Sequence, residues 1–103
     1  MPGRLAVKPT PTAASQIRRA SAWWRENRPK APFALAEDLE RAFELLALQP
    51  GIGARAVSSR FEGVRRLFLS RTGYHLYYRV NEAERQVEVL ALWHARRGEG
   101  PPV

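Results

Sequence analysis

Three short runs of alternating side chains follow one another in the C-terminal part of the chain. They extend from Val64 to Ser70, from Tyr74 to Val80 and from Gln86 to Trp93, and short turn-forming segments separate them. Alternation with a period of two is typical of half-buried β-strands, and connections as short as these join antiparallel neighbours. The pattern predicts a three-stranded antiparallel meander.

Two helical segments precede these strands. The first begins at a Thr-Pro-Thr sequence in which Thr10 or Thr12 can cap the helix, and it ends near residues 27–29. Its apolar stripe consists of Ala13, Ile17, Ala20 and Trp24. The second helix spans Phe33 to Leu48, with an apolar face made of Leu35, Leu39, Ala42, Phe43 and Leu46. We expect the two helices to form a hairpin that covers one face of the sheet.

The remaining segments complete the predicted fold. Leu5 to Lys8 is a candidate strand ended by Pro9, and residues 51–63 are expected to form a loop. The fold class is therefore α+β, with an N-terminal strand, an α-helical hairpin and a three-stranded antiparallel meander in one domain of residues 1–97. Residues 98–103 carry glycine and proline without a regular pattern, so we expect a disordered tail.

Alternation also sorts the strand side chains onto two faces of the sheet. The face expected under the helices consists of Leu67, Leu69, Leu76, Tyr78 and Val80. The opposite face is basic and aromatic, and it consists of Arg66, Phe68, His75, Tyr77 and Arg79. In the last strand both alternating sets are largely apolar, so alternation does not identify its inner face.

The chain is strongly basic. It has 17 Lys and Arg against 10 Asp and Glu, a formal net charge of +7, and Lys8 and Lys30 are its only lysines. Such a charge favours an acidic partner, which could be nucleic acid, an anionic protein segment or a membrane surface. Biased genomic composition explains the predominance of arginine over lysine equally well. Arginine can pair with carboxylate or phosphate through two hydrogen bonds.

Other classes of protein are disfavoured by what the sequence lacks. It has no cysteine and only two histidines, so we expect no disulfide, no metal site and no cofactor. The apolar run Leu5 to Val7 is too short for a signal peptide, and no run is long enough to span a membrane. A cytoplasmic protein without a membrane partner is expected.

Two segments and the order of the elements resemble the RelE/ParE superfamily of toxins from bacterial type II toxin–antitoxin modules. The segment VRRLFLSRTGYHLYYRV is similar to the family's strand, turn and tyrosine-containing strand, and VEVLALWHARR is similar to its final strand with a ParE-type His-x-x-Arg ending. The resemblance extends from Leu5 to Arg97. It implies a growth-inhibiting toxin, connected with plasmid stabilisation and neutralised by a cognate, ParD-like antitoxin.

The resemblance implies one of two activities. RelE-type members are ribosome-dependent messenger RNA endonucleases, whereas ParE-type members typically inhibit DNA gyrase by trapping its cleaved DNA complex. By position, the basic strand pair of RelE-type members becomes Arg66 and Phe68, the next arginine becomes His75, and the last basic position falls at or beside Arg96. RelE-type members often also have a tyrosine or histidine near the C-terminus. One basic residue of the strand pair and the C-terminal tyrosine therefore have no counterpart in this sequence. We expect a ParE-like, non-enzymatic inhibitor of gyrase without sequence-specific nucleic-acid binding.

The candidate residues fall into three sets. The residues expected to inhibit the target are His94, Arg96, Arg97 and Trp23, whereas Trp24 is expected in the core. The residues expected to bind the antitoxin are Arg66, Phe68, Arg71, His75, Tyr77 and Arg79, together with exposed apolar edges of the helical hairpin. An alternative set for an endonuclease is Arg66, His75 and Arg96. A further alternative is a non-toxic module that only binds an antitoxin.

Overall fold

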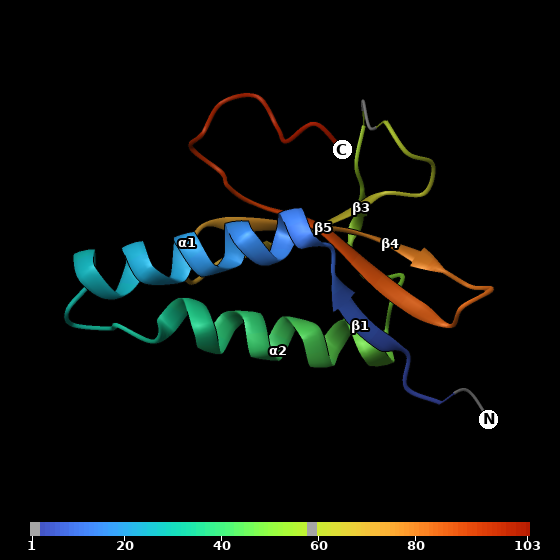
Figure 1. Cartoon of the computed structure of the whole chain (residues 1–103), viewed down its shortest axis with the longest axis horizontal. Helices are drawn as coiled ribbons and strands as arrows, with labels where there is room; N and C mark the ends of the chain where they lie inside the picture. The colour runs from blue at the N-terminus through green and yellow to red at the C-terminus, as the bar shows by residue number, and fades with distance from the viewer. Residues whose placement is uncertain (1–2, 58–59) are drawn as a thin grey trace.

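A computed structural model describes residues 3–57 and 60–103 and confirms the α+β fold, with the two helices side by side on one face of the sheet (Figure 1). The elements are β1 (Ala6–Pro9), α1 (Pro11–Asn27), α2 (Ala34–Leu48), β2 (Ala54–Arg55), β3 (Arg65–Leu69), β4 (Tyr74–Asn81) and β5 (Gln86–His94). The strand order is β1-β5-β4-β3-β2. The predicted meander of β3, β4 and β5 is confirmed, and β1 joins it in parallel with β5.

The sheet has one strand more than the sequence indicates. The prediction of a loop over 51–63 is wrong at β2, which pairs with Arg65 and Arg66 of β3. Two residues are too few for alternation to be visible, so only the pairing with β3 identifies them. Ser58 and Ser59 of the same predicted loop lie outside the described residues.

The helical hairpin follows the sequence closely. Thr10 caps α1 as predicted, because its hydroxyl oxygen accepts a hydrogen bond from the Ala13 N–H at 3.2 Å. Trp24 is buried as predicted, and its indole N–H donates to the Ala31 carbonyl at 2.8 Å, which ties α1 to the connector before α2. Phe33, predicted as the first residue of the second helix, lies just outside α2 and is 61% exposed.

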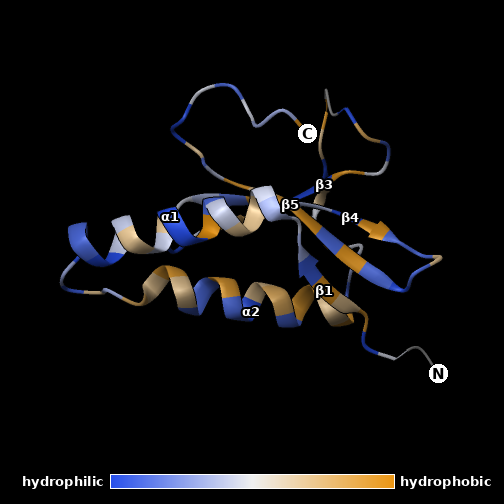
Figure 2. Ribbon diagram, in the orientation of Figure 1, coloured by the Kyte–Doolittle hydropathy of each residue, from blue (hydrophilic) through white to orange (hydrophobic). Residues whose placement is uncertain are grey.

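The main core lies between the helices and the inner face of the sheet. Figure 2 shows apolar residues on α2 and along β5. The sheet contributes the predicted residues, of which Leu69, Leu76 and Tyr78 are buried while Leu67 and Val80 are partly buried. The helices contribute the predicted stripe, including Ala13, Trp24, Leu35, Leu39, Ala42 and Leu46.

A β-bulge explains why alternation alone does not assign the inner face of β5. Tyr77 of β4 lies opposite Ala91, whereas the next residue lies opposite Val89, so Leu90 is an extra residue in β5. Before the bulge, Val89 faces the main core, and after it the core-facing residue is Leu92. The bulge therefore shifts the alternation by one residue, and both apolar sets of β5 are buried on opposite faces.

A second, smaller cluster covers part of the outer face of the sheet. It contains Val64, Tyr77, Leu90 and Ala91, with Val103 packed against it. Tyr77, which alternation places on the basic and aromatic face, does lie on that face, but its side chain is only 7% exposed and is therefore covered instead of open to a partner.

The segment 98–103 crosses the outer face without regular structure. The indole N–H of Trp93 donates to the Glu99 carbonyl at 2.8 Å, and the Arg60 N–H donates to the Val103 carbonyl at 2.7 Å. In Figure 1 this segment arcs over the sheet toward the β2–β3 connection. The contacts of this segment help to explain why Tyr77 is covered. The disorder expected for residues 98–103 stays a prediction.

Candidate functional site

The outer face of the sheet presents an aromatic and basic pair next to the covered Tyr77. Phe68 of β3 and His75 of β4 are opposite one another, with ring centroids 4.9 Å apart. Phe68 is 50% exposed, and Arg66 on the same face is exposed as well. This part of the predicted antitoxin-binding set is therefore contiguous and open to a partner.

His75 is held in an environment that favours its neutral form. Burial lowers its pKa below the ordinary value of 6.5, and the positive charge of Arg66 and the proximity of His94 lower it further. Its Nδ1 atom is buried without a hydrogen-bond partner among the described residues. At pH 7 the ring is therefore neutral, which is the state in which a histidine can accept a proton.

We expect His75 to titrate below pH 6.5 in the folded protein. The unfolded chain then binds a proton at this residue more readily than the folded one, so the free energy of unfolding decreases as the pH falls through 6.5. Long-range nitrogen–proton NMR spectra recorded across pH 4–8 would measure the pKa. In an Arg66→Ala variant it should rise toward 6.5. A value at or above 6.5 in the unmodified protein would contradict this assignment.

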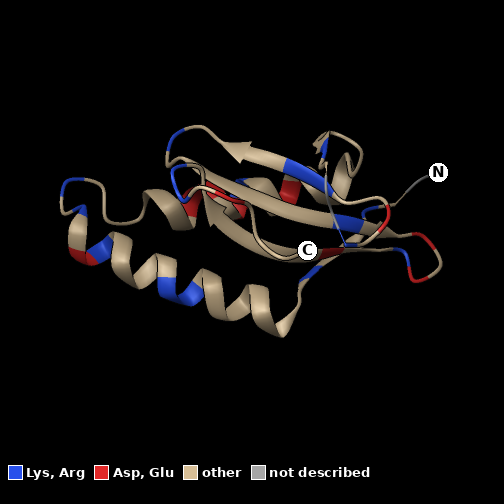
Figure 3. Ribbon diagram, turned by 90° about the horizontal axis from the view of Figure 1, so that it is seen from above, with Lys and Arg blue, Asp and Glu red and all other residues tan. Residues whose placement is uncertain are grey.

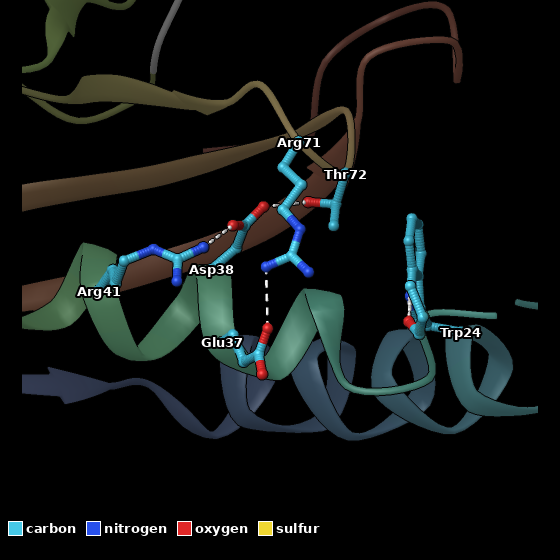
Figure 4. Close-up of polar contacts among 7 residues, drawn as sticks. Trp24, Glu37, Asp38, Arg41, Arg71 and Thr72 are labelled. Carbon is cyan, nitrogen blue, oxygen red and sulfur yellow. Dashed lines mark hydrogen bonds and ion pairs between the residues drawn. The ribbon is translucent and has the colours of Figure 1, made fainter. Parts of the chain in front are cut away.

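Two arginines of the predicted antitoxin-binding set already have partners within the chain. Arg71 pairs with Glu37 of α2 at 2.8 Å, as Figure 4 shows. Arg79 pairs with Glu88 of β5 at 2.7 Å, and its guanidinium lies 4.8 Å from the ring centroid of Phe61. These cations are thus less available to a partner's carboxylates than Arg66 is.

A buried polar connection positions the β3–β4 turn and was not predicted from the sequence. Asp38 of α2 is 7% exposed, and it accepts hydrogen bonds from the Thr72 hydroxyl at 2.9 Å and the Arg41 guanidinium at 2.7 Å (Figure 4). The signal is present in the sequence, because Asp38 lies three residues after Leu35 and four before Ala42, on the apolar face of α2. A carboxylate at such a position needs a partner, and the turn supplies it.

The residues predicted to inhibit the target come together in one cleft. Two adjoining hollows, of about 590 and 630 Å³, lie between α1, the β3–β4 turn and the end of β5, and both are lined by Trp23, Tyr74 and His94. The first is also lined by Arg96 and the second by Arg97. We call the two hollows together the arginine–tryptophan cleft. Trp23, which is 46% exposed, stands at their junction.

Contacts of its ring and of the neighbouring backbone fix His94 within this cleft. Its ring meets the Tyr74 ring edge-on at 4.9 Å between centroids, and its Nδ1 atom accepts a hydrogen bond from the Arg96 N–H at 3.1 Å. The Ala95 N–H donates to the Gly73 carbonyl at 2.8 Å, so the segment after β5 is tied to the β3–β4 turn. His94 therefore has the strand-terminal hydrogen bond that is the simplest role for such a residue, and it also holds Arg96 in place.

The alternative nuclease set is divided between two surfaces. His75 lies on the outer face opposite Trp93, whereas Arg96 lines the arginine–tryptophan cleft on the side of α1. A cleavage site needs an acid or base and a phosphate-binding cation at the same reacting group. Arg66 and His75 meet part of this requirement, and Arg96 is directed to a different site.

An apolar groove lies between the two helices on the opposite side of α1 from the arginine–tryptophan cleft. It has a volume of about 580 Å³, and its apolar lining includes Ala14, Ile17, Leu39 and Phe43. Glu40, Glu44 and Arg18 are its charged lining residues. This groove corresponds to the apolar surface of the helical hairpin that the sequence assigns to an antitoxin.

Metal and membrane sites receive no support from the described residues. Within 3–57 and 60–103, no group of three or more His, Cys, Asp or Glu side chains could hold a metal ion. In the same ranges, neither helix combines the length and the apolar character needed to cross a membrane.

Comparison with known proteins places this geometry in a family. The model of the ParE toxin of the type II toxin–antitoxin system, parDE, matches residues 7–98. A chain from the chromosomal ParDE system of Pseudomonas aeruginosa has 20% sequence identity and a TM-score of 0.70, with 90% of this chain and 98% of that chain covered. A chain from a RelBE toxin–antitoxin complex of Mycobacterium tuberculosis has 23% identity and a TM-score of 0.63, with 89% and 92% covered.

The fold is also shared with an isolated RelE toxin of Escherichia coli. A mutant of that toxin in the free state has 19% identity and a TM-score of 0.57, with 92% of this chain and 87% of that chain covered. Comparison with curated proteins finds no match. At these identities the solved structures show a common fold, and the match over residues 7–98 shows the family.

Proposed function

Because the chain belongs to the ParE toxin family of type II toxin–antitoxin systems, we propose that it inhibits DNA gyrase by trapping the cleaved DNA complex, and that a cognate antitoxin neutralises it. In this proposal the protein acts in the cytoplasm as a non-enzymatic inhibitor. The observation that carries it is the arginine–tryptophan cleft, in which Trp23, His94, Arg96 and Arg97 line adjoining hollows. The division of the nuclease set between two surfaces supports the same choice.

An antitoxin has two suitable surfaces. The groove between α1 and α2 is apolar at Ile17, Leu39 and Phe43, as a groove for an amphipathic segment needs to be. The outer face offers Arg66 and Phe68 to an acidic, partly disordered segment that orders when it binds. Solved structures that share this fold include toxin–antitoxin complexes of Mycobacterium tuberculosis and Escherichia coli, which agrees with a partner of this kind.

A RelE-like ribonuclease is the second candidate function. The observation that favours it is a neutral His75 beside Arg66 on the outer face. In such an enzyme, His75 would take the proton from the 2′-hydroxyl as its oxygen attacks the phosphate, and Arg66 would stabilise the charge on the phosphate. The bond from phosphorus to the 5′-oxygen would break, and this leaving oxygen would take its proton from water. Messenger RNA cut in programmed ribosomes, and not cut by a His75→Ala variant, would establish this function in place of gyrase inhibition.

Purified protein should reduce supercoiling by gyrase and increase the amount of cleaved plasmid released by detergent and protease. An Arg96→Ala/Arg97→Ala variant should be at least about tenfold less potent, because hydrogen bonds to a charged group contribute about 1.5–3 kcal/mol each. Gel electrophoresis of the plasmid measures both effects.

The matched control removes two positive charges from the opposite end of β5. Arg4→Gln/Arg85→Asn suits this purpose, because Arg85 has a φ of 51°, which asparagine tolerates, and lies next to the first residue of β5. Its potency should stay near that of the unmodified protein. Full supercoiling and no cleaved plasmid with the unmodified protein would reject gyrase as the target.

A further inference from the structure

The arginine–tryptophan cleft concentrates positive charge without lining carboxylates. Its first hollow includes Arg28, Arg71 and Arg96, and its second includes Arg19 and Arg97. Within residues 3–57 and 60–103, no Asp or Glu lines either hollow. Among the described residues, Arg71 alone of these five arginines forms an ion pair, with Glu37. The charge of the other four is therefore available to an anionic partner.

Two of these guanidiniums, those of Arg28 and Arg97, lie over tryptophan rings. The guanidinium carbon of Arg28 lies 5.0 Å from the ring centroid of Trp23 and 5.6 Å from that of Trp24. That of Arg97 lies 3.8 Å from the ring centroid of Trp93. A guanidinium over a ring keeps N–H donors at its edge. One donor of Arg28 is used by the Asn27 carbonyl at 3.1 Å, and its remaining donors can reach a phosphate.

Two arginines of the cleft are spread along α1, as binding of a nucleic-acid strand with successive phosphates requires. Arg19 and Arg28 are nine residues apart in sequence, along α1 and its C-cap, so they are separated by about 13 Å along the helix axis. Two or more successive phosphates of one DNA strand can be contacted over such a length. Figure 3 shows basic residues at two places along α1 and again in the connector that follows it.

The exposed ring of Trp23 lies between the arginines of the two hollows. Trp23 lines both hollows, is 46% exposed and carries Arg28 over its ring. A positively charged groove with an exposed aromatic ring is the combination that proteins use for single-stranded nucleic acid, where the ring stacks on an unpaired base. A protein segment would instead need an apolar pocket for its side chains. The groove that offers one, at Ile17 and Leu39, lies on the other side of α1.

We propose that the arginine–tryptophan cleft binds DNA through its phosphates, with an unpaired base stacked on Trp23, and without sequence preference. The inference rests on the proposed function, because cleaved DNA held by gyrase is the DNA that such a toxin meets. Contact with both gyrase and the strand would oppose religation by holding the broken strand in place. The cleft thereby provides the toxin's own contact with the DNA that gyrase holds.

Fluorescence anisotropy of a labelled single-stranded oligonucleotide of about a dozen nucleotides tests the proposal. The full-length protein should bind, and an Arg28→Ala/Arg96→Ala variant should bind at least about tenfold more weakly. The plot of log affinity against log salt should become shallower by about 1.4, since each phosphate contact on a single strand contributes about 0.7. Arg28 caps α1 through its backbone N–H, which the substitution retains. Circular dichroism checks the fold.

Two further variants separate stacking from charge. Oligonucleotide binding should quench tryptophan emission in the unmodified protein and much less in Trp23→Leu. The control Arg4→Gln/Arg85→Asn, which removes the same charge at the other end of the sheet, should retain most of the affinity. An equal loss in the control would show that only net charge matters and would overturn the proposal.

An acidic protein segment is the competing ligand, and oligoglutamate of equal charge represents it. Tighter binding of oligoglutamate than of DNA, with the same loss in the cleft variant, would overturn the proposal in favour of such a segment. Inhibition of gyrase without any binding of DNA by the cleft would reject this inference alone. Binding of DNA by the cleft without inhibition of gyrase would reject the proposed function and leave the DNA-binding cleft standing.

Discussion

Gly53→Ala should lower the free energy of unfolding by about 2–4 kcal/mol, because the position combines steric contact with a buried hydrogen bond. A Cβ atom on Gly53 would lie 2.6 Å from the Tyr78 hydroxyl oxygen and 2.9 Å from the Arg66 carbonyl oxygen. The Gly53 N–H donates to that hydroxyl at 2.8 Å within the core. The methyl group therefore forces apart the loop, β3 and β4, and breaks the bond that joins them.

Chemical denaturation monitored by circular dichroism measures this effect, and a second substitution tests its cause. Tyr78→Phe removes the hydroxyl and should by itself cost about 1–3 kcal/mol, because the Gly53 N–H then loses its partner. In the double variant the hydroxyl is absent from the clash, so the combined loss should be smaller than the sum of the single losses. Additive losses would show that the two residues act independently.

Gly51→Ala is the matched control, two residues earlier in the same loop. A Cβ atom on Gly51 meets nothing within 4 Å, and its φ is not in the left-handed region. The substitution should leave stability unchanged or raise it by about 0.4–1 kcal/mol through the unfolded chain. A loss like that of Gly53→Ala would attribute the effect to the loop's flexibility instead of to the contact with Tyr78.

The sequence predicts those parts of the fold that depend on local chemistry. The cap at Thr10, the apolar stripe of α1 and the alternation in β3 and β4 are each decided by residues close in the chain. Trp23 is selected because it lies one helical step from the buried Trp24 and can be exposed. Local pattern does not show that it lies beside the segment after β5, because about seventy residues separate them. The roles of these residues stay predictions.

The features that the sequence does not reveal depend on contacts between distant segments. β2 is identified as a strand by its pairing with β3, and Tyr77 is buried by a cluster that includes Val64, Leu90 and the C-terminal Val103. The bulge at Leu90 cannot be deduced from alternation in β5, since apolar residues occupy both faces. In each case a tertiary contact overrides the local pattern.

The ion pairs of the predicted antitoxin-binding set illustrate the same limit. The sequence predicts that Arg71 and Arg79 bind an antitoxin. In the structure each forms an ion pair with a carboxylate from another element, Arg71 with Glu37 and Arg79 with Glu88. Arg66 has no such ion pair among the described residues. The sequence pattern does not distinguish these arginines, whereas the ion pairs do. Arg66 is therefore the strongest candidate for binding an antitoxin's carboxylates.

Asp38→Ala should have the second large effect, a loss of about 2–3 kcal/mol in the free energy of unfolding. The substitution leaves the buried Thr72 hydroxyl without its acceptor, which costs about 1–3 kcal/mol, and it removes the partner of Arg41. Arg41 is 62% exposed, so water replaces that partner at little cost. Thermal and chemical denaturation measure the loss. A double-mutant cycle with Thr72→Val should assign most of it to the hydrogen bond between Asp38 and Thr72.

Glu37→Ala separates this buried connection from the exposed ion pair beside it. Glu37 and Arg71 are about half exposed, so removing the pair, together with a carboxylate in the first turn of α2, should cost about 1 kcal/mol or less. Because Thr72 lines the arginine–tryptophan cleft, Thr72→Val should also weaken the cleft's binding of DNA without changing the charge of the protein. Unchanged DNA affinity in a destabilised Thr72→Val protein would show that the turn need not be held for the cleft to bind.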